Sequence, residues 1–290
     1  GPEISETGLK YVHNDTCYPA ILVIGQFIHA IQSGKYDPHK VALMLFQTGG
    51  GCRASNYISL LRKALKKAGY GYVPVISFSF AGIEKHPGFR LTLPMIYHML
   101  YAVLYADLLM SLVNQVRPYE VSAGDTTAKV EFWTSELLNR FDRGEGMSRK
   151  KMRGIFEEIC ADFKSIPVTG EEKVRVGVVG EIYIKFSSLG NNQLEQFLLD
   201  EGAEPVVPGL TDFLIFKIYN RVSDVEMFGG SRAKQALCKF FMGYVEKCQL
   251  DMIDALKNSG FRAPGTFAEL HQLIYGYLND GCKMGEGWLL

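Results

Sequence analysis

The sequence predicts an α/β protein with two Rossmann- or flavodoxin-like β-α-β lobes with parallel sheets, plus a helical insert and a helical C-terminal part. An apolar strand-like run, a glycine-containing turn and an amphipathic helix follow one another twice, near residues 45 and 176. Between and after these repeats, apolar residues recur at helical spacing. We expect the first lobe at 3–120, the insert at 121–168, the second lobe at 169–225 and the C-terminal part at 226–290.

The first lobe is expected to contain a helix followed by a complete β-α-β unit. Cap-forming residues and a proline precede the first apolar helical pattern, as is typical of a helix start. Both expected strands are short apolar runs bounded by glycine or polar residues. The four elements, in the order helix, strand, helix and strand, span 18–33, 41–47, 54–68 and 73–78.

A long apolar segment, Leu91 to Val113, closes this lobe. It has about the length needed to cross a bilayer, and Asp107 is its one formally charged residue. It also contains Pro94 and His98, and the rest of the chain has the pattern of a soluble α/β protein. We therefore expect a long buried or oligomer-interface helix and no membrane span.

The remaining elements follow from the same periodicities. The insert should hold two helices within 125–165, split by the polar turn from Arg143 to Met147. The second lobe should contain a strand at Val174 to Val179, a helix near Asn192 to Glu201 and a strand in the run EPVVP. The C-terminal part should be helical over 231–259 and 266–278.

Composition excludes some classes of function. The chain has 31 basic and 31 acidic residues among 290, with no long run of either sign. Binding to nucleic acid or to an anionic membrane by bulk electrostatics is therefore not expected. Six cysteines are too few for a disulfide scaffold, and no signal-peptide pattern opens the chain, so we expect a reducing cytoplasm. The apolar ending GEGWLL predicts that the C-terminal part is truncated.

Two cysteines occupy expected helix starts. Cys52 follows the glycines of QTGGGCRASNY, and Cys17 follows the cap formers of HNDTCYP. Free N–H groups and the positive end of the helix dipole favour an anion there, so each thiol is favoured as a thiolate. Cys17 and Cys52 are therefore the candidate metal ligands.

The other cysteines are weaker candidates. Cys160, Cys238 and Cys248 lie inside helical patterns, where cysteine usually behaves as a small core residue. Cys282 lies in a glycine-flanked loop and is a secondary candidate ligand. Zinc sites and thioredoxin-like redox sites usually use C-x-x-C pairs, and the sequence has none. Iron–sulfur ligation from separate loops is the favoured chemistry, and a redox disulfide between Cys17 and Cys52 is the alternative.

A second candidate site binds phosphate or a CoA pyrophosphate. Gly49, Gly50 and Gly51 would let an anionic group approach the backbone, with Arg53 nearby, and Glu181 follows the turn after the second lobe's first strand. The loop lacks the lysine of a Walker A motif, and GVVGEIYI does not match G-x-G-x-x-G. This pattern is therefore less specific than the paired cysteines.

Several runs carry a family resemblance. They are LKYVHNDTCYPAILVIGQ, QTGGGCRASNYISLLRKALKKAG followed by VPVISF, RLTLPMI, YADLLM, VRPYE, RVGVVGEIYIKF, EGAEPVVPGLTDF and GEGWLL. In this order, over nearly the whole chain, they resemble the C-terminal, dehydratase-like region of large proteins related to the activator of 2-hydroxyacyl-CoA dehydratases, the CoA-substrate-specific enzyme activase family. In those proteins ASKHA-type ATPase domains precede the matching region.

The resemblance implies a function in anaerobic metabolism. It implies a module that contributes cysteine ligands to a [4Fe-4S] cluster, for low-potential electron transfer or dehydratase-like radical chemistry on an acyl-CoA. Cys17 and Cys52 are the positions carried over as ligands. The implied partners are the upstream ATPase domains and dehydratase subunits or a dehydratase-like electron acceptor. A further copy of the chain is a partner suggested only by the apolar helix Leu91 to Val113.

The sequence departs from the family in ways that limit the expected activity. It contains no ATPase domain, so the chain by itself should not hydrolyse ATP, and the isolated fragment is expected to be inactive. Family members continue past GEGW into a segment with a further cysteine, and Cys282 matches no family cysteine. Two ligands are also fewer than a [4Fe-4S] cluster requires. The alternative function is a non-catalytic CoA- or phosphate-binding or assembly module of the same multidomain protein.

Overall fold

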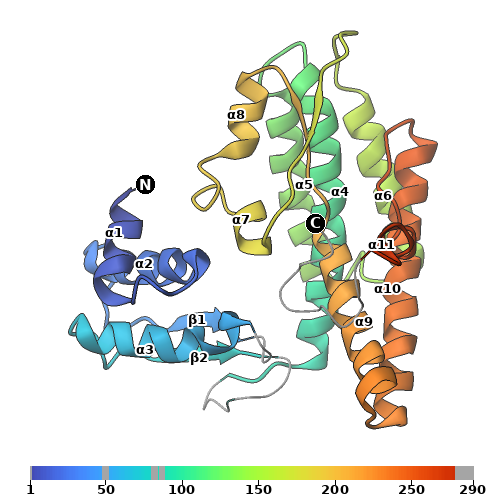
Figure 1. Ribbon diagram of the computed structural model, residues 1–290. Coiled ribbons are helices and arrows are strands. Elements are labelled where there is room, and N and C mark those ends of the chain that lie inside the picture. Colours follow the sequence, from blue (N-terminus) through green and yellow to red (C-terminus); the bar gives the residue numbers. More distant parts are fainter. Residues whose placement is uncertain (1, 48–51, 80–83, 85–88, 278–290) are drawn as a thin grey trace. The chain divides into compact units, whose positions relative to one another are not determined.

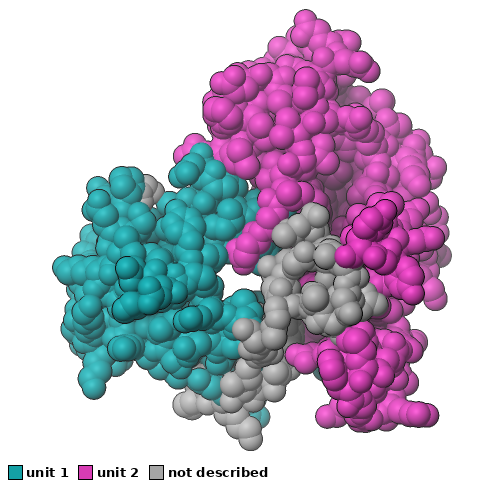
Figure 2. Space-filling view, viewed as in Figure 1, with its two compact units in different colours: residues 1–93, 182–192 teal, residues 94–181, 193–290 magenta. Residues whose placement is uncertain are grey.

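The computed structural model describes residues 2–47, 52–79, 84 and 89–277. The chain divides into two compact units, each built from two segments: unit 1 comprises residues 1–93 and 182–192, and unit 2 comprises 94–181 and 193–290 (Figures 1 and 2). The protein is mixed α/β and mostly helical, and each unit contains a parallel two-stranded sheet over the described residues. An α/β fold with parallel strands is therefore confirmed.

Unit 1 contains the predicted helix and β-α-β unit. Strands β1 and β2 pair in parallel, with Leu43 opposite Val75 and Phe46 opposite Phe78, and helix α3 connects them. All four predicted elements are present, with boundaries shifted by a few residues. The elements of unit 1 are α1 (Pro2–Tyr11), α2 (Tyr18–Gln32), β1 (Leu43–Phe46), the 3-10 helix η1 (Arg53–Asn56), α3 (Tyr57–Lys67), β2 (Val75–Phe78) and α7 (Ile182–Phe186).

Helix α1 was not predicted, and it packs against α2 through glycines. A methyl group added to Gly8 would lie 2.2 Å from the carbonyl oxygen of Ile21, and one added to Gly25 would lie 2.2 Å from that of Ile4. The absence of side chains at both positions therefore permits the two backbones to approach. On the rest of α2, Ile24 and Ile28 are fully buried in the core of unit 1.

Unit 2 is a group of long helices with a small sheet. The two helices predicted within 125–165 are present as α5 and α6, and the long C-terminal helix is present as α10. The elements are α4 (Leu93–Val116), the 3-10 helix η2 (Arg117–Tyr119), α5 (Asp125–Asp142), α6 (Arg149–Lys164), β3 (Arg175–Gly177), α8 (Leu194–Asp200), β4 (Glu204–Val206), α9 (Leu210–Phe228), α10 (Arg232–Asn258) and α11 (Phe267–Ile274).

Helix α4 supplies much of the core of unit 2. Tyr101, Leu104, Leu108 and Leu112 are fully buried among side chains of the other helices. By length and composition alone, the stretch 93–119 could cross a membrane, and it is the one such helix among the described residues. From Leu100 onward much of the helix is buried within unit 2, as expected of a core helix, whereas Leu93, Met95 and Tyr97 at its start are exposed.

The second β-α-β repeat is much smaller than a Rossmann lobe. Strands β3 and β4 are three residues each and pair in parallel, with Arg175 opposite Glu204 and Gly177 opposite Val206. Helix α8 packs against β4, whereas α7, which lies between β3 and α8 in sequence, belongs to unit 1. Over the described residues neither sheet exceeds two strands, so two full Rossmann-like sheets are not observed.

Candidate functional site

Cys17 lies directly before helix α2, as the sequence predicted. It is the N-cap residue, and its carbonyl oxygen accepts hydrogen bonds from the backbone N–H groups of Ala20 and Ile21 at 3.0 and 3.3 Å. Its side chain makes no capping hydrogen bond, and its Sγ lies 3.1 Å from the hydroxyl oxygen of Tyr57. The thiol is thus held, partly buried, at the start of a 15-residue helix.

Cys52 occupies the equivalent position before η1, and its side chain is exposed. Its carbonyl oxygen accepts a hydrogen bond from the backbone of Ser55 at 3.1 Å. The buried side chain of Gln47, at the carboxyl end of β1, fixes this turn by donating to the carbonyl of Ser55 at 2.9 Å. The Ser77 hydroxyl on β2 donates to the same amide at 2.6 Å. The sheet therefore anchors the segment that carries Cys52.

Tyr57 contacts Cys17 from the helix that follows the Cys52 turn. It is the first residue of α3, five positions after Cys52, and its hydroxyl contacts the Cys17 thiol. The Tyr57 side chain thus reaches from the start of α3 to Cys17 at the start of α2, and Cys52 lies at the start of the short η1 turn that precedes α3. Both are free thiols, without a disulfide between them.

Of the other predicted site residues, the structure describes Arg53 and Glu181. Gly49, Gly50, Gly51 and Cys282 lie outside the described residues. Arg53 is exposed in η1, beside Cys52. The exposed Glu181 ends the first segment of unit 2. Among the described residues, no group of three or more His, Cys, Asp or Glu is arranged to hold a metal ion.

Two further cysteines behave as the predicted core residues. Cys160 on α6 and Cys248 on α10 are fully buried in unit 2. Burial raises the pKa of each thiol to about 11, so both remain protonated at neutral pH. Cys238 is partly exposed on α10. Nucleophilic or ligand chemistry is therefore disfavoured at Cys160 and Cys248.

The charged residue of the apolar helix has a structural task. The Asp107 carboxylate, which is 5% exposed, accepts hydrogen bonds from Leu210 N at 2.8 Å, Thr211 N at 2.7 Å and Thr211 Oγ1 at 2.5 Å. It therefore caps the first turn of α9 from another helix. A methyl group at Gly209 would lie 2.7 Å from this carboxylate, so only glycine fits there. The sequence marks Asp107 as the one acid in an apolar run, but it does not indicate that its partner is the start of α9.

A second buried carboxylate joins three parts of unit 2. Glu204 on β4, 1% exposed, accepts a hydrogen bond from the Tyr119 hydroxyl at 2.7 Å and pairs with the guanidinium of Arg262. The pairing compensates the cost of burying the charge. The local sequence gives no signal for this role of Glu204, because Tyr119 and Arg262 are 85 and 58 positions away.

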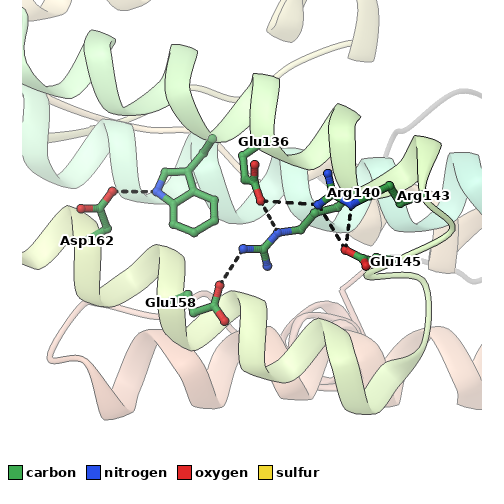
Figure 3. Close-up of polar contacts among 7 residues, drawn as sticks. Glu136, Arg140, Arg143, Glu145, Glu158 and Asp162 are labelled. Carbon is green, nitrogen blue, oxygen red and sulfur yellow. Dashed lines mark hydrogen bonds and ion pairs between the residues drawn. The ribbon is translucent and has the colours of Figure 1, made fainter.

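The polar cluster between α5 and α6 is internally satisfied (Figure 3). Arg140 donates to Glu136 at 2.7 Å and to Glu158 at 3.0 Å, and the Trp133 indole donates to Asp162 at 2.8 Å. The hydrogen bond from Arg140 lowers the pKa of Glu136 below its ordinary value. The contacts of Arg140 with Glu158 and of Trp133 with Asp162 cross from α5 to α6, which supports a role in helix pairing.

Comparison of the chain with family models, curated proteins and solved structures gives no match in any of the three. The candidate site is therefore defined by geometry, and it comprises Cys17, Cys52 and Tyr57 at helix starts of unit 1.

Proposed function

We propose that this chain is a cytoplasmic module of a 2-hydroxyacyl-CoA dehydratase activator-related protein, in which Cys17 and Cys52 supply part of an iron–sulfur site. The observation that carries the proposal is the contact of Cys17 with Tyr57, the first residue of the helix that follows the Cys52 turn in the same unit. We also propose that the fold consists of two Rossmann-like lobes. The parallel pairing of β1 with β2 and of β3 with β4 supports this.

Among the described residues, Cys17 and Cys52 could supply two of the four thiolate ligands of a cluster. Thiolates bind iron, and a helix start offers N–H groups and positive potential to a sulfide-bearing anion. A cluster held by four thiolates needs two further ligands, and the described residues bring no third candidate to this place. We therefore limit the proposal to ligation by Cys17 and Cys52, with the remaining ligands supplied by other parts of the assembly. When bound, such a cluster would accept and donate single electrons.

Tyr57 has a supporting role in this proposal. Its hydroxyl, 3.1 Å from the Cys17 sulfur, can donate a hydrogen bond to a thiolate. A hydrogen bond to the charged form of a thiol favours that form, and hydrogen bonds to cluster sulfurs adjust the reduction potential. Tyr57→Phe is therefore expected to retain iron but change the reduction potential of the bound cluster.

The test is anaerobic reconstitution with iron and sulfide, applied to this chain alone and to this chain together with the ATPase domains that the proposal gives it as partners. Iron and labile sulfide per chain are measured together with the EPR spectrum of the reduced protein. We expect Cys17→Ala and Cys52→Ala to lose iron, whereas Cys238→Ala, the partly exposed control, keeps it. Unchanged iron content in both variants would refute the ligand assignment.

The same variants distinguish the alternative function. If the chain is a non-catalytic CoA- or phosphate-binding module, calorimetry with CoA should show binding that does not depend on Cys17 or Cys52. Such binding, together with unchanged iron content, would replace the cluster proposal.

A further inference from the structure

A separate cleft lies within unit 2, where the ends of α4 and α6 meet the segment after α10. Its volume is about 210 Å³. Sites for drug-sized ligands and cofactors usually measure about 300–1,000 Å³. A whole nucleotide or CoA molecule is therefore too large for it, and a small molecule fits.

Hydrogen bonds between distant parts of the chain fix the shape of the cleft. The side-chain amide of Gln115, near the end of α4, donates to the carbonyl of Arg262 at 2.9 Å and accepts from its backbone N–H at 2.8 Å. Gly260 precedes this segment with φ +76°, a conformation that favours glycine. The cleft is thus formed before any ligand binds, which reduces the entropy cost of binding.

The charges around the cleft leave one cation without an acidic partner. Arg262 is paired with the buried carboxylate of Glu204, so its charge is compensated. The Lys164 ammonium lies 5.4 Å from the centre of the Phe261 ring, and a methyl group on Gly260 would be 3.6 Å from its nitrogen. Across the described ranges, Lys164 forms no ion pair. An anion in the cleft would therefore meet a positive charge that no acidic side chain among the described residues pairs with.

Apolar side chains stand beside this cation. Val168, on the cleft wall, is 52% exposed, and the partly exposed ring of Phe261 lies under the Lys164 ammonium. Both would lose water-accessible area against a hydrocarbon group, which favours binding. An inorganic anion would gain nothing from them.

We propose that this cleft binds a small organic carboxylate, with its carboxylate on Lys164 and its hydrocarbon part against Val168 and Phe261. The site goes beyond the proposed cluster function, because none of its residues belongs to unit 1. Butyrate has the size and chemistry to serve as the probe, and inorganic phosphate tests the need for a hydrocarbon part.

The experiment is a titration of the isotope-labelled full chain with butyrate, followed by two-dimensional NMR. We expect saturable shifts around residues 115–119 and 260–262. Lys164→Gln should weaken binding by about tenfold or more, because a charge-assisted contact is lost. Lys247→Gln, an exposed control on α10, should bind like the original chain. Val168→Glu, an exposed change that adds a negative charge, should also weaken butyrate binding. Because it alters a different residue, the test does not depend on the folding of the Lys164→Gln variant alone.

Three results would overturn the proposal. The first is the absence of saturable binding in the millimolar range. The second is equal binding by the Lys164→Gln and Lys247→Gln variants when both show native spectra. The third is phosphate binding as tight as butyrate binding, because the site would then be a simple anion patch.

Discussion

Removal of the Asp107 side chain should separate α9 from α4 at its first turn. Asp107 is 5% exposed and accepts three hydrogen bonds, two from backbone N–H groups and one from the Thr211 hydroxyl. Asp107→Ala leaves those donors without an acceptor inside unit 2. An unsatisfied buried donor costs about 1–3 kcal/mol, and loss of a helix N-cap costs about 0.5–2 kcal/mol. Together these two effects predict a loss of about 1.5–5 kcal/mol.

The conservative variant Asp107→Asn tests how much of this stability depends on the second carboxylate oxygen. Its single carbonyl oxygen can replace the carboxylate oxygen that faces Thr211, but its NH₂ group would then face the N–H of Leu210. We expect a loss of about half that of Asp107→Ala, on the order of 2 kcal/mol. Asp142→Ala, an exposed acid at the end of α5, is the control and should stay within about 0.5 kcal/mol.

The assay combines thermal unfolding with hydrogen exchange. A unit of this size should lose about 2–4 °C in melting temperature per kcal/mol, so Asp107→Ala should melt on the order of 10 °C lower. The transition of unit 1 should be unaffected, and the amides of Leu210 and Thr211 should exchange faster than those in the middle of α9. If Asp107→Ala matches the Asp142→Ala control in stability, the capping argument is wrong.

Three further predictions test other parts of the structure. Gly8→Ala should destabilise unit 1 by about 1–3 kcal/mol in denaturant titration, because the added methyl group would lie 2.2 Å from a backbone carbonyl of α2. Gly154→Ala on α6 has open space around it and should stabilise the protein by about 0.5–1 kcal/mol, so equal effects of the two changes would contradict the packing argument. Alkylation at pH 8, followed by mass spectrometry, should modify the exposed Cys52 faster than Cys160. Cys160 should react very slowly, because burial raises its pKa to about 11. The reverse order would disprove the assigned burial. Burial raises the pKa of Glu120, but the hydrogen bonds that it accepts at the start of α5 outweigh this effect and leave its pKa below the ordinary value. Glu120 therefore stabilises the fold above its unfolded pKa of about 4.3, and this contribution is lost as the pH falls through the lower folded pKa. Glu120→Gln should accordingly be less stable than the original chain at pH 7 and nearly equal to it near pH 2, and a pH-independent difference would refute the assignment.

The sequence located nearly all the long elements, because their signals are local. The apolar periodicity of α2, α5, α6 and α10 and the short runs of β1 and β2 are visible in windows of a few residues. Helices α1 and α9 were missed for different reasons. The first owes its place to a glycine-mediated contact with α2, and the second begins after EPVVPG, a run that indicates only a strand and a turn. Its start is fixed by Asp107, about a hundred positions earlier.

The candidate site shows the same division. The sequence by itself determined that Cys17 and Cys52 begin helices and that Cys160 and Cys248 lie in a core, because cap and periodicity signals are carried by neighbouring residues. Only the tertiary structure decided that Tyr57 contacts Cys17, that Asp107 caps α9 and that Lys164 faces a cleft with no ion-pair partner among the described residues. Each of these contacts, between side chains 40 to 104 positions apart or at the meeting of several helices, depends on how the helices pack, which local patterns do not encode.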